Sequence, residues 1–89
     1  MENLNNKFID IYPVLDLHGE FSDTVLFLIN DFIQDNVKLG NSIVVIMHGK
    51  GSGVLKKKTH EILSKHELVK QYALASDNLG ATIVELKCQ

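Results

Sequence analysis

The sequence predicts a single α/β domain, with strands and helices in the order β-α-β-α-β-β. Residues 43–47 form an unbroken, mostly β-branched apolar run, which indicates a strand buried on both faces of a parallel or mixed sheet. On either side of this run, apolar residues recur at helical spacing. The length of 89 residues suffices for one hydrophobic core.

A first strand is predicted over residues 14–18, where leucines alternate with polar residues. The leucines point to one face of the sheet, and Asp16 and His18 point to the other. Gly19 ends this strand, so the acid and the histidine lie close to its carboxyl end.

The first helix is predicted over residues 22–39. Ser22 or Asp23 is the expected N-cap, and Gly40 suits the position after the last turn. The inward-facing stripe of this helix consists of Val25, Leu28, Ile29, Phe32 and Ile33.

A second helix is predicted over residues 54–66, followed by strands over residues 69–75 and 81–87 with a turn at 76–80. We expect His60 to be a surface or packing residue without a functional role. The inward-facing stripe of this helix consists of Leu55, Thr59, Ile62, Leu63 and His66.

The glycine-rich turn after residue 47 predicts an anion site. Gly49, Gly51 and Gly53 allow positive φ and close approach of a ligand, and the turn leads into the amino end of a helix. Lys50, Lys56 and Lys57 add positive charge, which favours phosphate. The glycine spacing does not match a Walker P-loop. A strand, a crossover helix and a parallel strand should bring this turn and the His18-Gly19 turn to the same sheet edge.

Composition limits the kind of protein. It is 45% hydrophobic and 22% charged, and its net charge of −2 argues against a protein that coats nucleic acid by bulk electrostatics. We expect residues 1–13 to form an arm and residues 14–89 the domain. The single cysteine, Cys88, and the lack of a signal peptide or an apolar span predict a cytoplasmic protein without membrane contact. We expect a monomer or a weak dimer.

Two motifs resemble a known family. LDLHG at residues 15–19 and HGKG at residues 48–51, with the helix start GVLK at residues 53–56 and the final strand TIVEL at residues 82–86, are similar to the Smr (small MutS-related) domain. The form of the second motif and the final strand are most similar to the Smr domain at the carboxyl end of the second type of bacterial MutS. The resemblance covers nearly the whole chain.

The resemblance implies a two-layer α+β sandwich with a four-stranded mixed sheet, like the carboxyl-terminal domain of translation initiation factor three. It also implies nucleic-acid binding, with nicking endonuclease activity in several members. The chain departs from the family in two respects, since it contains no arginine and only Asn78-Leu79-Gly80 remains of a usually glycine-rich loop. Lysine must therefore act on phosphate as a point charge.

The residue types alone suggest phosphodiester hydrolysis. His18 and His48 suit the acid and the base, Lys50 and the turn N–H groups suit the phosphate charge, and Asp16 suits the orientation of His18. We favour a metal-independent reaction, because one carboxylate and two imidazoles make a poor magnesium site; manganese or magnesium is the alternative. A capping aspartate and a plain tight turn would explain the same motifs without catalysis.

The main hypothesis is thus a nicking endonuclease that acts on DNA or RNA. The alternatives are a non-catalytic module that binds DNA, RNA or the ribosome, and a protein–protein adaptor.

Overall fold

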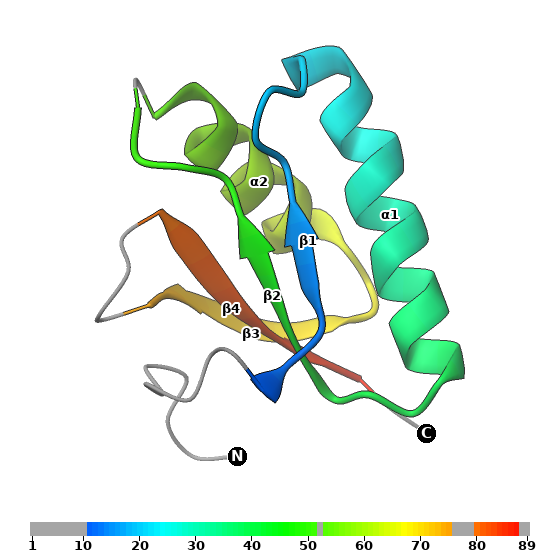
Figure 1. The fold of residues 1–89 in the computed structure, drawn as a ribbon. Coiled ribbons are helices and arrows are strands. Elements are labelled where there is room, and N and C mark those ends of the chain that lie inside the picture. Colours follow the sequence, from blue (N-terminus) through cyan, green and yellow to red (C-terminus); the bar gives the residue numbers. More distant parts are fainter. Residues whose placement is uncertain (1–10, 52, 76–79, 88–89) are drawn as a thin grey trace.

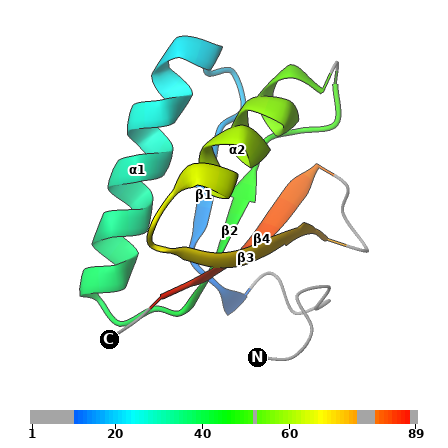
Figure 2. The ribbon, with the colours of Figure 1, turned by 180° about the vertical axis from the view of Figure 1, so that it is seen from behind.

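The computed structural model describes residues 11–51, 53–75 and 80–87. The elements follow the predicted order, and both helices cover the same face of the sheet (Figure 1 and Figure 2). The two-layer arrangement predicted for this chain is therefore confirmed. The elements are β1 (Val14–Asp16), α1 (Ser22–Lys38), β2 (Ile43–Met47), α2 (Val54–Lys65), β3 (Val69–Leu74) and β4 (Ala81–Leu86).

The described sheet has four strands in the order β1-β2-β4-β3. β1 is parallel to β2, whereas β4 is antiparallel to both of its neighbours, β2 and β3. β1 is therefore an edge strand, and β2 lies inside the sheet. Pro13 is tolerated at this edge, where its carbonyl oxygen accepts a hydrogen bond from the Val45 N–H at 2.8 Å.

Both faces of the sheet contain buried apolar residues. On the helix side, alternate strand residues pack against the stripes of α1 and α2, and Val25, Ile29 and Ile33 are fully buried as predicted. In α2 the predicted stripe is also turned inward, with Ile62 and Leu63 in the same core. The opposite face holds a smaller buried cluster of Ile43, Val45, Ala75, Ala81 and Ile83. β2 is thus buried on both faces, as its unbroken apolar run predicted.

Several elements end earlier than predicted. β1 ends at Asp16 rather than at residue 18, because the chain turns and the Glu20 N–H donates to the Leu17 carbonyl at 3.0 Å. α1, α2, β3 and β4 each end one residue early. Four residues of the predicted turn at 76–80, together with Cys88 and most of the arm, lie outside the described residues.

The start of α1 differs from the prediction. Its N-cap is Phe21, not Ser22 or Asp23, and no side chain caps the helix. Instead, the N–H and the hydroxyl of Thr24 donate to the Phe21 carbonyl at 3.1 and 2.9 Å. At the other end, Gly40 has φ +81° directly after the C-cap, as predicted.

Glu85 on β4 is a buried charge that the sequence did not reveal. It is 7% exposed, accepts a hydrogen bond from Gln71 Nε2 at 2.6 Å and pairs with Lys70 Nζ at 3.7 Å. The hydrogen bond from Gln71 is the main cause of its lowered pKa; burial opposes this change and the charge of Lys70 adds to it.

Candidate functional site

The carboxyl ends of β1 and β2 lie side by side at one edge of the sheet, as the crossover rule predicted (Figure 1). Asp16 is in register with Met47, and the Leu17 N–H donates to the Met47 carbonyl at 2.8 Å. The His18-Gly19 turn and the His48-Gly49 turn therefore start from neighbouring points.

Asp16 and His18 both have exposed side chains. Asp16 Oδ1 accepts a hydrogen bond from the backbone N–H of His18 at 2.8 Å. Leu15 and Leu17 pack against the helix-side core, so Asp16 between them projects from the opposite face of the sheet. The carboxylate therefore holds the backbone of the turn and leaves the His18 imidazole exposed.

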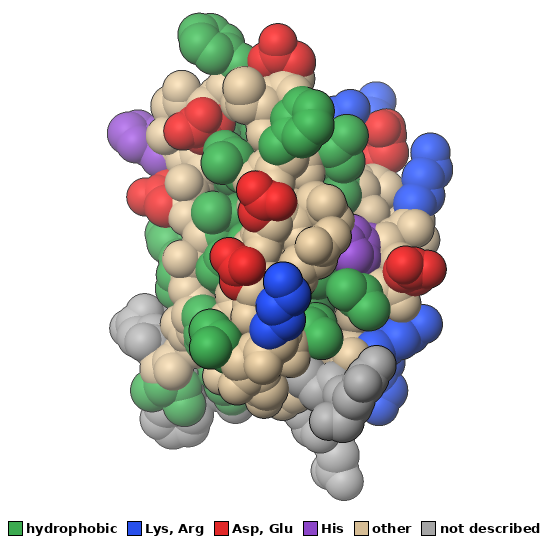
Figure 3. Space-filling view, turned by 90° about the vertical axis from the view of Figure 1, so that its right-hand side faces the viewer, with side chains coloured by type: hydrophobic (Ala, Val, Ile, Leu, Met, Phe, Trp, Pro, Cys, Tyr) green, Lys and Arg blue, Asp and Glu red, His purple; other side chains and the backbone are tan. Residues whose placement is uncertain are grey.

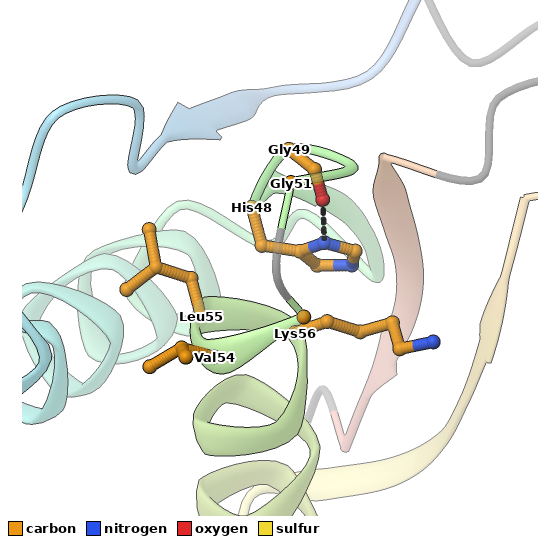
Figure 4. Close-up of a pocket in the computed structure, with 7 residues that line it drawn as sticks. His48, Gly49, Gly51, Val54, Leu55 and Lys56 are labelled. Carbon is orange, nitrogen blue, oxygen red and sulfur yellow. Dashed lines mark hydrogen bonds between the residues drawn. The ribbon is translucent and has the colours of Figure 1, made fainter.

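A pocket of about 170 Å³ lies in the glycine turn between β2 and α2 (Figure 4). Gly49 and Gly53 have φ values of +84° and +85°, a region that favours glycine. Gly51 does not have a positive φ, and a Cβ there would meet no described atom within 4 Å. The pocket is lined by His48, Gly49, Gly51, Gly53, Val54, Leu55 and Lys56.

The first two N–H groups of this turn are used inside the protein. Those of His48 and Gly49 both donate to the Gly80 carbonyl oxygen, each at 2.9 Å. The Gly49 N–H was predicted to bind an anion, but it already donates a hydrogen bond within the protein. Among the described residues of the turn, the N–H groups left for an anion are those of Lys50, Gly51 and the first turn of α2, where helix N–H groups lack intrahelical partners.

His48 is buried on the helix side of the sheet and is only 4% exposed. Its Nδ1 lies 3.0 Å from the Gly49 carbonyl oxygen, and its Nε2 lies 2.8 Å from Thr82 Oγ1. Burial is the main cause of its lowered pKa; the bond to Gly49 opposes this change and the charge of Lys56 adds to it. The two motif histidines therefore differ in their access to solvent.

His60 is the residue that the sequence analysis missed. Its Nε2 lies 2.7 Å from the same Thr82 hydroxyl, and its ring contacts those of His48 and Tyr72. The available signal was its position four residues after Lys56, which puts both residues on one side of α2. Thr82 gave no signal at all, because its partners lie 34 and 22 residues away in sequence.

The lysines predicted to bind phosphate occupy different places. Lys50 is exposed in the turn, and Lys56 lines the pocket, where its side chain extends beneath the His48 ring in Figure 4. Lys57 instead lines a second hollow, between the amino ends of α1 and α2. Lys50, Lys56 and the glycines therefore form one group, which Lys57 adjoins along α2.

Charge is segregated between the two helices. α2 carries four lysines and one glutamate, whereas α1 carries three aspartates and one lysine. Figure 3 looks onto α1 and shows acidic side chains over this helix and lysines along the edge toward α2. A polyanion would therefore meet the least repulsion on the α2 side.

The described residues contain no group of three or more His, Cys, Asp or Glu side chains that could hold a metal ion. These residues therefore supply no third ligand for a manganese or magnesium ion that Asp16 and a histidine would hold. Neither helix in the described ranges has the length and hydrophobicity of a membrane span.

Residues 15–87 match the family model of the Smr domain. The endonuclease MutS2 of Pelotomaculum thermopropionicum is 40% identical over 86 residues, which cover 93% of this chain and 11% of that protein. The endonuclease MutS2 of Helicobacter pylori is 40% identical over 72 residues, which cover 81% of this chain and 9% of that protein. The chain thus spans about a tenth of the length of these curated relatives.

Solved structures share the fold. The Smr domain of Thermus thermophilus MutS2 matches with a TM-score of 0.81 and 28% identity, covering 83% of this chain and 96% of that one. YdaL, a stand-alone small MutS-related protein from Escherichia coli, matches with a TM-score of 0.80 and 24% identity. The match covers 98% of this chain and 79% of that one. With the family match over nearly the whole chain and the two motifs at one sheet edge, this protein belongs to the Smr domain family.

Proposed function

We propose that this domain binds nucleic acid and nicks it by hydrolysing phosphodiester bonds in DNA or RNA. The observation that carries the proposal is the meeting of two His-Gly turns at one sheet edge. One turn exposes an imidazole, and the other forms a lysine-bearing pocket at the amino end of a helix. The relatives' name, endonuclease MutS2, supports the same activity, although it describes much longer proteins.

Hydrolysis of a phosphodiester requires a base that activates water, an acid for the leaving oxygen, and positive charge near the phosphate oxygens. We assign proton transfer first to His18, because its imidazole is exposed. Asp16 supports His18 by holding the backbone of the same turn. Lys50, Lys56 and the N–H groups at the start of α2 would bind the phosphate.

A second proton transfer through His48 stays a prediction. Both of its ring nitrogens are hydrogen bonded, so a proton reaches this ring only through Thr82 or after the bond to Gly49 opens. An exposed histidine and a buried one thus share the edge, and His18 is the one that a substrate can touch directly.

The test uses purified protein with supercoiled plasmid and with single-stranded RNA, each with manganese or with a chelator. We expect His18→Ala to slow cleavage by about 100-fold or more, the usual contribution of a general acid or base. Asp35→Ala, which removes an exposed aspartate on α1, serves as the matched control for Asp16→Ala. Cleavage that continues at the wild-type rate in both His18→Ala and Asp16→Ala would rule out the proposed chemistry.

A second candidate is a non-catalytic module that binds DNA, RNA or ribosomal phosphate. It is favoured by one observation, namely that Asp16 and His48 each hydrogen bond to turn backbone, as structural residues do. This function predicts salt-dependent binding without cleavage. For either function we propose a cytoplasmic domain that acts as a monomer or a weak dimer, which sedimentation of the purified protein would test.

A further inference from the structure

Thr82 joins three elements behind the glycine turn. It is fully buried on β4, with Oγ1 2.8 Å from His48 Nε2 and 2.7 Å from His60 Nε2. The two imidazoles meet edge to face, with ring centroids 5.9 Å apart at 88°, and the ring centroid of Tyr72 on β3 lies 5.1 Å from that of His60. We call Thr82, His48 and His60 the Thr82 network.

The protons in this network can be assigned by counting donors. The Gly49 carbonyl only accepts, so His48 Nδ1 must carry a proton. In a neutral ring His48 Nε2 is then bare and takes the single hydroxyl proton of Thr82. Thr82 Oγ1 is left as an acceptor, so His60 Nε2 must donate to it. Every bond thus points from His60 toward the glycine turn.

We propose that Thr82 and His60 are positioning residues that hold His48 as its Nδ1–H tautomer and thereby fix the glycine turn in its anion-binding shape. A role of this network in catalysis depends on the proposed function, whereas the tautomer of His48 does not. The turn is held from two sides, because the Gly80 carbonyl accepts from the His48 and Gly49 N–H groups while His48 Nδ1 donates to the Gly49 carbonyl. Rotation of the imidazole would release the second of these anchors.

Protonation affects the two histidines differently. A charged His48 would donate from both nitrogens, so the buried hydroxyl proton of Thr82 would lose its acceptor as long as His60 carries its proton on Nε2. A charged His60 would still donate from Nε2 and would leave the network intact. The groups that face His48 are His60 and Lys56 on α2 and, beyond His60, Tyr72 on β3. The lowered pKa of His48 agrees with this assignment.

Nitrogen-15 NMR of histidine side chains tests the tautomer directly. We expect His48 to carry its proton on Nδ1 and His60 on Nε2. His66 is an internal reference: its Nδ1 accepts from the Leu68 N–H at 3.1 Å and its Nε2 lies 2.9 Å from Asn30 Oδ1, so it must be the Nε2–H tautomer. A proton on His48 Nε2 at neutral pH in the wild type would overturn the proposal.

Thr82→Val removes the hydroxyl and keeps the shape, and Thr82→Ser restores the hydroxyl. We expect Thr82→Val to release His48 from a single tautomer and to weaken inorganic phosphate binding, followed at the Gly51 amide, by about three- to tenfold, the size of one net hydrogen bond. Thr82→Ser should keep both properties. The matched control is Thr59→Val, because Thr59 is equally buried and its hydroxyl has no hydrogen-bond partner among the described residues.

The outcomes separate this inference from the proposed function. Wild-type protein that never nicks, yet shows the expected tautomer and the loss of phosphate binding in Thr82→Val, would refute the nuclease and keep the positioning role. Thr82→Val that behaves like Thr59→Val in both readouts would refute the positioning role, whatever the nicking rate. If Thr82→Val does not fold, His60→Leu removes the other donor and is judged by the same two readouts, with His60→Gln as the conservative variant.

Discussion

The His18-Gly19 and His48-Gly49 turns share a dipeptide, a glycine with φ near +80° and a place at the end of a parallel strand. Their histidines nevertheless lie in opposite surroundings. His18 is exposed, whereas His48 is 4% exposed and hydrogen bonded at both ring nitrogens. The reason is the position of the strand: β1 is an edge strand, while β2 has β4 beside it, and Thr82 on β4 and Gly80 directly before β4 contact His48.

The same local sequence therefore serves two purposes in this domain. At the edge strand, an acid holds the backbone of the turn and the imidazole stays available to a ligand. At the interior strand, the imidazole itself holds the turn. Backbone N–H groups and lysines are then the groups that can contact a ligand.

Replacement of each histidine by alanine should separate the turns most clearly. His48→Ala should lower the free energy of unfolding by about 2–4 kcal/mol, because it removes buried packing and leaves Thr82 without an acceptor. His18→Ala should change it by no more than about 0.5 kcal/mol, as expected for an exposed side chain. Urea unfolding measures both values, and equal losses would contradict the contrast.

Alanine at two glycines of the second turn separates stability from binding. Gly49→Ala should cost about 1–2 kcal/mol, because its φ of +84° strains an L-residue. Gly51→Ala should leave the free energy of unfolding within about 0.5 kcal/mol, since its φ is not positive and its Cβ would meet no described atom. It should nevertheless weaken phosphate binding, because Gly51 lines the pocket. Wild-type phosphate affinity in Gly51→Ala would mean that the anion does not bind at this point of the turn.

The buried histidines should make stability depend on pH near neutrality. Burial is the main cause that lowers the pKa values of His48 and His60 from 6.5, so the unfolded chain binds more protons than the folded chain as the pH falls below this value. Their contribution to stability is complete above pH 6.5 and is lost below it, by at most about 1.4 kcal/mol per pH unit for each group.

Urea unfolding across this pH range is the measurement. His60→Gln should reduce the slope, and an unchanged slope in this variant would contradict the expectation. Glu85 affects stability in a lower pH range. Its pKa is lowered from 4.5, first by the hydrogen bond from Gln71. Its contribution to the free energy of unfolding is therefore present above pH 4.5 and is lost as the pH falls further. Glu85→Gln should therefore change the acid window alone, and a change near pH 6.5 would show that this assignment is wrong.

The smallest expected effect concerns the lysines beside the interior turn. Lys56→Gln and Lys57→Gln should leave the fold intact, but each lysine that contacts a phosphate should reduce the slope of log affinity against log salt by about one. We expect this reduction for Lys56, which lines the pocket, and use Lys87→Gln, at an exposed residue after β4, as the control. Titrations of labelled DNA and RNA at several salt concentrations measure the slopes, and an unchanged slope for Lys56→Gln would remove it from the binding site.

The architecture and the shared edge of the two turns could be predicted from the amino-acid sequence alone. The apolar run at residues 43–47 predicted a strand buried on both faces, helical spacing predicted both inner stripes, and the crossover rule predicted the shared edge. These features depend on periodicity and chain connectivity, which a single sequence contains.

The burial of His48 and the hydrogen bond of the Gly49 N–H, by contrast, depend on how the elements pack together. The His48 environment is built by Thr82, His60 and Gly80, which come from other elements, and the same contacts take up the Gly49 N–H. Such contacts depend on strand order and register across the sheet, because a hydrogen-bond partner 34 residues away leaves no local pattern in the chain. Two identical dipeptides therefore acquire different chemistry from their neighbours in space.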